Sequence, residues 1–414
     1  MFHESIAITG VGVLACNGLG REAYWDALRN GRSGIRQIQR FDASEFPCQI
    51  AGELLDFNPE DFMRKSEVKN WHRHVHQAVA SSRLAVDDAS LAKAGYDSER
   101  IAVAFGTSIG APNEIYEESQ LAYQSQGWRK ISKLATSSYA GHSATVHVTV
   151  NLGMRGPAIT ISSGCATGLD VIGWGVQQIR SGHVDAALVG ATESPVYPLA
   201  LAGACSLGIV SKRNSDPEGA MRPFDRNSDG LVLSDAAVAL VLERAGAARA
   251  RGARILGELV GHGSAAEGMN PLILDKDGKG LARAISTALT NSGVTPDCLD
   301  NAHPHGVSLT MYDRSETNAY KLALGPSAYR IPISATKSLT GQSYAVGGLL
   351  GVASALFSLN TGIVPATKNL TDPDPACDLD YVPLHARMND INTALVTSIS
   401  FGGTHSAVVL RRMN

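Results

Sequence analysis

Apolar segments alternate with segments of helical periodicity along this chain, and this alternation most constrains its fold. Strands that are apolar throughout need cover on both faces, so they predict sheets with helices packed on each side. The chain has 42 glycines, many at the ends of apolar runs, where they mark tight turns or close backbone approaches. In the first part of the chain we expect strands at residues 6–13, 101–105, 158–161, 186–190 and within 231–242, and helices at 22–29, 68–92 and 166–180.

A second series of the same kind begins near Ala253. It predicts strands at 255–261, 331–335, 394–400 and 406–410, a strand that runs into a loop at 301–306, and helices at 278–291, 315–324 and 343–359. The similar order predicts an internal duplication of two α/β halves, residues 1–250 and 251–414, although no residue-level repeat is visible. No Pro- or Ser-rich linker separates the halves, so we expect them to pack into one compact body.

Composition excludes several classes of protein. Charged residues make up 18% of the chain and the formal net charge is −3, so a large core can be buried and no nucleic-acid partner is indicated. The sequence shows no signal peptide and no apolar run long enough to span a bilayer. The six cysteines form no CxxC pair and no metal-ligand spacing with histidine. We therefore expect a soluble, cytoplasmic protein with reduced thiols, no metal and no membrane partner.

The strongest chemical feature is the segment 159–168, which reads ITISSGCATG. A β-branched strand runs into small residues and then into a helix, so Cys165 is expected at a strand-to-helix turn. There the helix N-terminus favours the thiolate, and the Cys165 backbone N–H is free to bind an oxyanion. A lone cysteine is by default a buried core residue, and we keep that interpretation for the other five cysteines.

This segment resembles the nucleophile motif of β-ketoacyl-acyl-carrier-protein synthase II-like ketosynthases, which are thiolase-like condensing enzymes. Further segments that resemble this family follow in the same order: GATE at 190–193, RPFD at 222–225, SATKSLTG at 334–341, CDLDYVP at 377–383 and FGGT at 401–404. The resemblance covers nearly the whole chain. It implies a thiolase-like α/β fold, in which two duplicated halves form a layered α-β-α-β-α body.

The resemblance also implies the chemistry of a type II fatty-acid or polyketide ketosynthase, a decarboxylative Claisen condensation. In such an enzyme Cys165 accepts an acyl group from the phosphopantetheine of an acyl carrier protein. A malonyl group on the carrier protein then extends it, and no other cofactor is needed. His305 is implied as the catalytic histidine, whereas His303 is expected to be a structural residue at a strand end. Lys337 is implied to hold a polar network behind the site, through Asp313 or Glu316.

The family's gating phenylalanine corresponds to Phe401, whose backbone N–H is implied to join that of Cys165 in an oxyanion hole. Ser400 replaces the glycine that precedes this phenylalanine, and we expect it to stiffen the gating loop. His405 stands where the family usually has asparagine, and Asp235 stands where it usually has glutamate.

Three further departures lie in the motifs closest to Cys165. Gln342 occupies the place of the family's second histidine; a primary amide donates a hydrogen bond to a thioester oxygen but carries no proton. Val307 and Leu309 replace two threonines whose hydroxyls meet the pantetheine arm. Each missing hydrogen bond is expected to cost about 1 kcal/mol.

Three functions fit this pattern. The first is an active ketosynthase, specialised for secondary metabolism, in which Cys165, His305, Lys337 and Phe401 are retained. The second is a non-elongating partner of a heterodimer, similar to the chain-length-factor subunits of polyketide systems, although those usually lack the cysteine. The third is an acyltransferase that moves acyl groups through Cys165 without condensation. The resemblance implies a dimer, with an identical or a related ketosynthase subunit.

Overall fold

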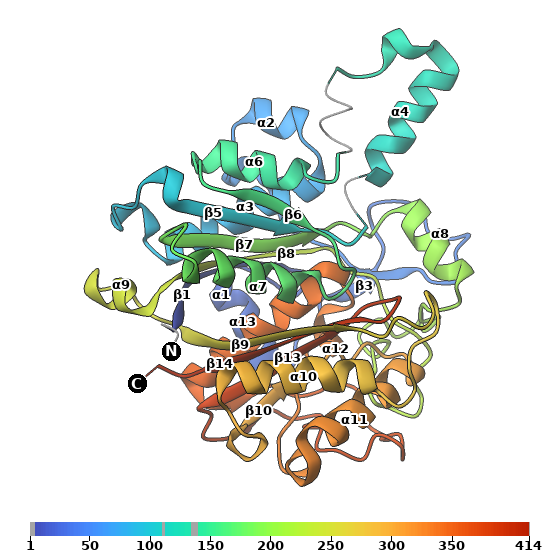
Figure 1. The fold of residues 1–414 in the computed structure, drawn as a ribbon. Helices are drawn as coiled ribbons and strands as arrows, with labels where there is room; N and C mark the ends of the chain where they lie inside the picture. The colour runs from blue at the N-terminus through green and yellow to red at the C-terminus, as the bar shows by residue number, and fades with distance from the viewer. Residues whose placement is uncertain (1–4, 110–111, 134–139, 414) are drawn as a thin grey trace.

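The computed structural model describes residues 5–109, 112–133 and 140–413, and within 112–118 it describes the backbone alone (Figure 1). The strands of the first half are β1 (Ile6–Ala15), β2 (Gly18–Leu19), β3 (Ile35–Gln37), β4 (Ile50–Gly52), β5 (Ile101–Gly106), β6 (Ala158–Ile161), β7 (Ala186–Glu193) and β8 (Ala236–Arg244). Those of the second half are β9 (Gly257–Ala266), β10 (Asn301–His303), β11 (Ile363–Val364), β12 (Arg387–Met388), β13 (Thr393–Ile399) and β14 (Thr404–Arg411).

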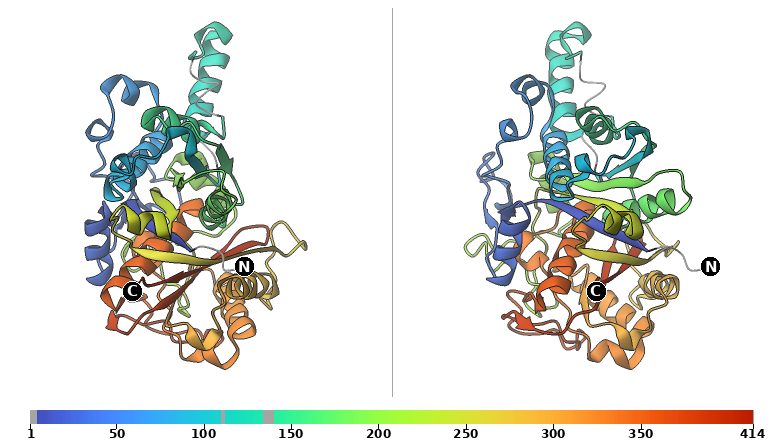
Figure 2. Two further views of the ribbon diagram at one scale, coloured as in Figure 1. Left: turned by 60° about the vertical axis from the view of Figure 1, so that its left-hand side comes forward. Right: turned by 90° about the vertical axis from the view of Figure 1, so that its left-hand side faces the viewer.

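The helices of the first half are α1 (Arg21–Arg29), α2 (Lys65–Asn70), α3 (Arg73–Asp88), α4 (Pro112–Gln126), α6 (Ser143–Leu152), α7 (Thr167–Arg180), α8 (Pro198–Ser206) and α9 (Ala245–Ala250). Those of the second half are α10 (Lys279–Ser292), α11 (Thr310–Leu324), α12 (Lys337–Thr340) and α13 (Gly347–Thr361). Most of these elements pack into one body, from which α4 stands away (Figure 2).

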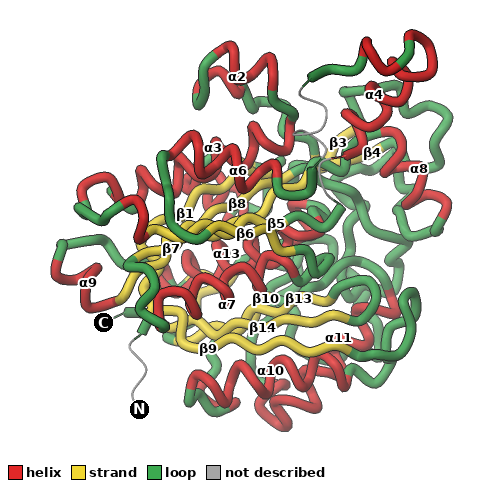
Figure 3. Tube along the Cα trace, turned by 45° about the horizontal axis from the view of Figure 1, so that its top comes forward, coloured by secondary structure: helices red, strands yellow, loops and turns green. Residues whose placement is uncertain are grey.

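The elements form the layered α-β-α-β-α body predicted from the sequence (Figures 1 and 3). Helices α3 and α6 cover one outer face, α7 and α13 lie between the two sets of strands, and α10 and α11 cover the other outer face. Across the described residues the main strands run in the order β10-β13-β14-β9-β1-β8-β7-β5-β6. The start of β1 joins the halves, because Ile6, Ala7 and Ile8 pair antiparallel with both β8 and β9.

All ten residues of β1 are buried, as an apolar strand covered on both faces requires. Two of its glycines permit close contact with α3. A Cβ atom at Gly10 would lie 2.1 Å from the Ala85 backbone oxygen, and one at Gly12 would lie 2.0 Å from that of Ser81. These glycines therefore set the distance between the helix and the strand.

The central helix α13 is apolar around its whole circumference. The expectation that no apolar run is long enough to span a bilayer is wrong, because the stretch Tyr344–Thr361 is long and apolar enough to cross a membrane; 83% of it is buried inside the fold. A helix that lies between two sets of strands needs apolar side chains on every face, which accounts for this composition.

Three of the predicted elements differ from the structure. The helix expected at 68–92 is broken, because Trp71 and His72 are extended and separate α2 from α3. Trp71 instead packs edge-on against the His147 ring, 4.8 Å between centroids. The helix expected from 315 begins at Thr310. The strand expected at 331–335 is wrong: only Ile333 forms a bridge, with Ala302, and Pro332 lacks the N–H that a ladder needs.

Candidate active site

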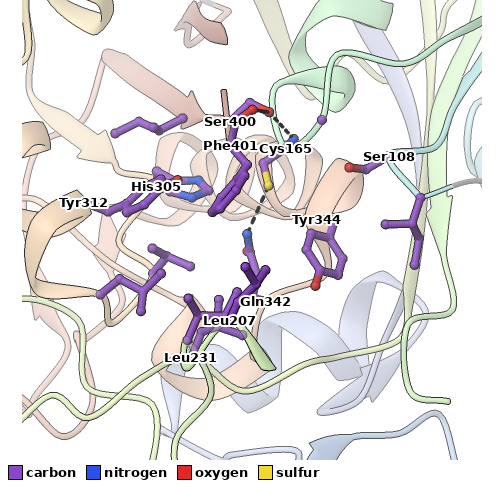
Figure 4. Close-up of a pocket in the computed structure, with 16 residues that line it drawn as sticks. Ser108, Cys165, Leu207, Leu231, His305, Tyr312, Gln342, Tyr344, Ser400 and Phe401 are labelled. Carbon is purple, nitrogen blue, oxygen red and sulfur yellow. Dashed lines mark hydrogen bonds between the residues drawn. The ribbon is translucent and has the colours of Figure 1, made fainter. Parts of the chain in front are cut away.

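A cavity of about 330 Å³ lies where the two halves meet (Figure 4). Seven of the residues singled out from the sequence line it: Cys165, His305, Val307, Leu309, Gln342, Ser400 and Phe401. Lys337, Asp313 and Glu316 are buried behind the lining, and His405 is buried beyond the gating loop. The lining is mainly apolar, with a few polar groups near the sulfur, which is the usual composition of a small-molecule site.

Cys165 lies at the turn between β6 and α7, where the sequence places it. Gly164 has φ +63°, a left-handed conformation that other residues rarely adopt, and it turns the chain toward the helix. The turn is closed by the Ser163 N–H, which donates to Thr167 Oγ1 at 2.8 Å. Cys165 is buried, and its sulfur faces the cavity (Figure 4).

Burial favours the thiol form of Cys165 and outweighs the stabilisation of the thiolate expected from the helix N-terminus. Burial raises the pKa of Cys165 to about 12; the Lys337 charge and the Phe401 backbone N–H oppose this without cancelling it. Gln342 Nε2 lies 3.4 Å from the sulfur and donates to it (Figure 4). Desolvation in a closed apolar cavity outweighs these favourable contacts.

A test of this protonation state is the pH dependence of alkylation by iodoacetamide. Because the thiolate is the nucleophile and the pKa of Cys165 lies near 12, its alkylation rate should rise about tenfold per pH unit between pH 7 and 9. Peptide mass mapping separates Cys165 from the exposed Cys298, which serves as the internal control for the reagent. A rate that reaches a plateau below pH 8 would show a stabilised thiolate instead.

His305 is a neutral imidazole that faces the cavity. Burial is the main cause that lowers its pKa well below the usual value, and the charges of Lys337 and His405 add to it. Its Nδ1 has no hydrogen-bond partner among the residues that the structure describes. A neutral imidazole with a free nitrogen can accept a proton or donate one.

Two buried carboxylates hold the loop that carries His305. Glu316 accepts hydrogen bonds from the N–H groups of His305 (2.6 Å) and Gly306 (2.8 Å). Asp313 accepts one from the Val307 N–H at 3.1 Å and one from the Phe224 N–H at 2.9 Å. Since α11 supplies both carboxylates, the helix fixes the position of the loop.

Lys337 acts on this loop by a different contact from the one predicted. Its Nζ donates to the His305 backbone oxygen, and within the described residues no direct ion pair joins it to Asp313 or Glu316. The two carboxylates act on it through their charges, which raise its pKa, but burial dominates and lowers the value to about 8. The tight packing of the loop leaves its backbone oxygen, not the carboxylates, within reach of the ammonium group.

The Ser400 side chain bonds to the Cys165 backbone N–H, which the sequence predicted to be free to bind an oxyanion. The Cys165 N–H donates to Ser400 Oγ at 3.1 Å (Figure 4). The expectation that this N–H is free is therefore wrong in the unliganded structure. The cause is the side chain at position 400, which a glycine would lack.

The two remaining departures from the family pattern are both buried and make polar contacts. His405 Nε2 lies 2.8 Å from Glu267 Oε1, and each side chain is only 1% exposed. Asp235 lies 3.0 Å from both Arg40 and Arg73. The His405 pair joins the strand after the gating loop to β9, whereas Asp235 ties together segments of the first half.

Several lining residues were not found from the sequence. They are Ser108, Ile109, Leu207, Ile209, Leu231, Tyr312 and Tyr344. Most lie in apolar segments that resemble core, so no local signal distinguishes them. Glu193 could have been found, because it ends the GATE motif. It accepts hydrogen bonds from the Thr107 hydroxyl (3.0 Å) and the Ile109 N–H (3.3 Å), and so it positions that part of the lining.

Comparison with known sequences adds an independent finding. The family described as Beta-ketoacyl synthase, N-terminal domain, matches residues 3–248, and the C-terminal domain of the same name matches residues 256–371. The chain is 37% identical to the tetracenomycin polyketide synthase ketoacyl synthase alpha subunit of Streptomyces glaucescens, over 99% of this chain and 97% of that protein. It is 36% identical to 3-oxoacyl-[acyl-carrier-protein] synthase 2 of Synechocystis sp., over 99% and 98%.

Solved structures agree with this match to β-ketoacyl synthases. One is a type II polyketide synthase acyl-carrier protein in complex with its ketosynthase bound to the hexaketide; the match has a TM-score of 0.91 and 32% identity, and covers 99% of this chain and 100% of that chain. Another is the ishigamide ketosynthase/chain length factor, with a TM-score of 0.92, 31% identity and full coverage of both chains, 100% and 100%. The expected thiolase-like α/β fold is confirmed by these neighbours.

Proposed function

The chain belongs to the β-ketoacyl synthase family, and we propose that it condenses a Cys165-bound acyl group with a malonyl group in a type II polyketide or fatty-acid system. The observation that carries this proposal is the meeting of Cys165, His305 and the Gln342 amide in one cavity. A nucleophile, a neutral imidazole and a hydrogen-bond donor in one apolar cavity are the groups that thioester chemistry needs.

The first step is transfer of the acyl group to Cys165. The thiol loses its proton to the neutral imidazole of His305 as the sulfur attacks the acyl carbonyl carbon. The bond between that carbon and the pantetheine sulfur breaks, and the proton passes to the released pantetheine thiol. The raised pKa of Cys165 makes this proton transfer necessary, because the sulfur starts as a thiol.

The second step uses the same cavity for the malonyl thioester. Loss of carbon dioxide leaves an enolate, whose oxygen accepts hydrogen bonds from His305 and from the Gln342 amide. The enolate carbon forms a bond to the acyl carbonyl carbon, the bond from that carbon to the Cys165 sulfur breaks, and the released thiolate takes up one proton from water. Gln342 is held for this role by its backbone, which bonds to Val232 O at 2.7 Å and to the Ser234 N–H at 3.0 Å.

We propose an acyl carrier protein as the donor of both groups, because a carrier protein is bound to the ketosynthase in one neighbouring structure. We also propose a dimer, with an identical subunit or a chain-length-factor-like one, because the ishigamide neighbour is a ketosynthase/chain length factor. Strand β6 lies at the edge of the sheet, and its Ile159 is 39% exposed, which suits the joining of sheets between two subunits.

Gln342 favours a second candidate, acyl transfer without condensation. A carboxamide donates a hydrogen bond but cannot carry the positive charge of an imidazolium, which would stabilise the enolate oxygen that decarboxylation forms. Transfer of an acyl group to Cys165 does not need that positive charge. The two candidates therefore differ only in whether the malonyl group reacts.

The test mixes the purified protein with acyl-carrier protein and malonyl-carrier protein and follows intact masses. A Cys165 acyl adduct followed by a β-ketoacyl product supports condensation, and an adduct that never reacts further supports the acyltransferase. If no adduct forms and the protein binds tightly to another ketosynthase, it is a non-elongating partner subunit.

Replacing Gln342 with histidine tests its assigned position. The Gln342→His variant should release carbon dioxide from malonyl-carrier protein about tenfold faster or more, because histidine adds a proton-carrying donor. The rate of Cys165 acylation is the control and should change less. An unchanged decarboxylation rate would show that Gln342 lies outside the reacting centre.

A further inference from the structure

The peptide of Cys165 is held on both sides by hydroxyl groups from the end of β13. Ser398 Oγ donates to the Cys165 backbone oxygen at 2.7 Å, and Ser400 Oγ accepts from the Cys165 N–H at 3.1 Å. The first contact leaves the oxyanion position open. The contact with Ser400 fills the oxyanion position, because an incoming thioester oxygen needs the same Cys165 N–H.

The site fits the Ser400 hydroxyl closely. A Cβ atom at Gly164 would lie only 1.8 Å from Ser400 Oγ, so the hydroxyl occupies space that only a glycine leaves open. Ser400 is 1% exposed, and its Oγ also donates to the Phe401 backbone oxygen at 3.1 Å. The hydroxyl therefore uses its donor and one acceptor position where it lies, and a substrate must break its bond to the Cys165 N–H to replace it.

The backbone at Ser400 is held independently of its side chain. The Ser400 N–H donates to Thr404 O at 2.7 Å, and the Gly403 N–H donates to Ser400 O at 3.1 Å. Because these bonds fix the loop, the hydroxyl can leave the Cys165 N–H by rotation of the side chain alone. No movement of the gating loop is required.

We propose that the Ser400 hydroxyl is an internal occupant of the oxyanion hole, which each acyl thioester must displace before Cys165 can be acylated. This inference rests on the proposed function of Cys165. Ser400 is a positioning residue: it forms no bond to the substrate and limits the rate by holding the Cys165 N–H. In the step it limits, the acyl carbon exchanges its bond to the pantetheine sulfur for one to Cys165, and the thiol proton ends on the pantetheine.

The experiment compares the wild type with Ser400→Ala, Ser400→Gly and Ser398→Ala. Cys165 acylation by hexanoyl-pantetheine is timed by intact mass. In parallel, methyl methanethiosulfonate converts the thiol to a mixed disulfide and releases methanesulfinate, without a carbonyl that needs the oxyanion hole. Removal of one competing hydrogen bond should raise the acylation rate about five- to tenfold in both Ser400 variants. Modification by methyl methanethiosulfonate should stay within about twofold, and Ser398→Ala should not accelerate acylation.

Four results would overturn the inference while the proposed function stands. The first two are slower acylation of Ser400→Ala, which would make the hydroxyl a helpful donor, and an unchanged acylation rate. The third is faster acylation of Ser400→Gly alone, which would assign the effect to backbone freedom. The fourth is equally faster acylation of Ser398→Ala, which would show general loosening of the site. If neither the wild type nor any variant is acylated, although methyl methanethiosulfonate modifies Cys165 in them, the proposed function fails and the inference fails with it.

Discussion

Replacing His305 with alanine is expected to lower the condensation rate by about a hundredfold or more. His305 is the neutral imidazole in the cavity, and it serves both proton transfer from the Cys165 thiol and hydrogen bonding to the enolate. Because burial raises the pKa of Cys165 to about 12, the thiol form predominates at pH 7 and this proton transfer is needed. Turnover with acyl- and malonyl-carrier protein measures the loss, and the mass of the Cys165 adduct shows whether acylation or extension is affected.

His303 provides a matched control two residues away. It is 1% exposed, burial lowers its pKa to about 3, and neither ring nitrogen has a hydrogen-bond partner among the described residues. His303 does not line the active-site cavity. His303→Ala should cost about 2–3 kcal/mol of stability through the space it leaves, while the folded protein keeps its rate within about threefold. Equal losses of activity in the two variants would mean that His305 acts only through packing.

Replacing Glu316 with alanine is expected to have the largest effect on stability. Glu316 is 1% exposed and accepts three hydrogen bonds, from the N–H groups of His305 and Gly306 and from the Thr397 hydroxyl at 2.9 Å. Each donor left buried without a partner costs about 1–3 kcal/mol, so the free energy of unfolding should fall by roughly 3–5 kcal/mol. Activity should fall as well, since the backbone of His305 loses its main anchor.

Glu316→Gln separates the role of shape from the role of charge. Glutamine keeps one oxygen that can accept from His305 and Thr397, but its NH₂ group faces the Gly306 N–H. The expected loss is about 1–2 kcal/mol, smaller than for alanine. Urea unfolding monitored by fluorescence gives both values. A loss below about 1 kcal/mol for Glu316→Ala would show that water replaces the carboxylate and that the loop does not depend on it.

The sequence predicted the elements that local periodicity determines. The strands β1, β5, β6 and β7 and the helices α7 and α10 lie within a few residues of their expected positions. The errors arose where tertiary contacts override local pattern. Trp71 leaves the helical segment to pack on His147, and Pro332 removes a donor that the expected strand would need. The contact of Trp71 has no signature in the neighbouring residues, whereas Pro332 is itself a sequence signal against the expected strand.

The residues of the candidate site also separate into those that the sequence predicted and those that it did not. The motif around Cys165, the placement of His305 and Gln342 at one cavity, and the anomaly at Ser400 could all be stated from the sequence, because each is a short pattern of residue types. The lining residues Leu207 and Tyr344 could not, because they come from segments without a motif and reach the cavity only through the chain path.

The sequence by itself therefore predicted Cys165 as the nucleophile, and it determined the fold class and the departures from the family pattern. Tertiary structure decided the chemical state of those residues. Burial raises the pKa of the Cys165 thiol and lowers that of the His305 imidazole, and the side chain of Ser400, 235 positions from Cys165, fills the space beside its N–H. The physical reason is that desolvation and hydrogen-bond occupancy depend on every atom around a group, whereas a motif records only its neighbours along the chain.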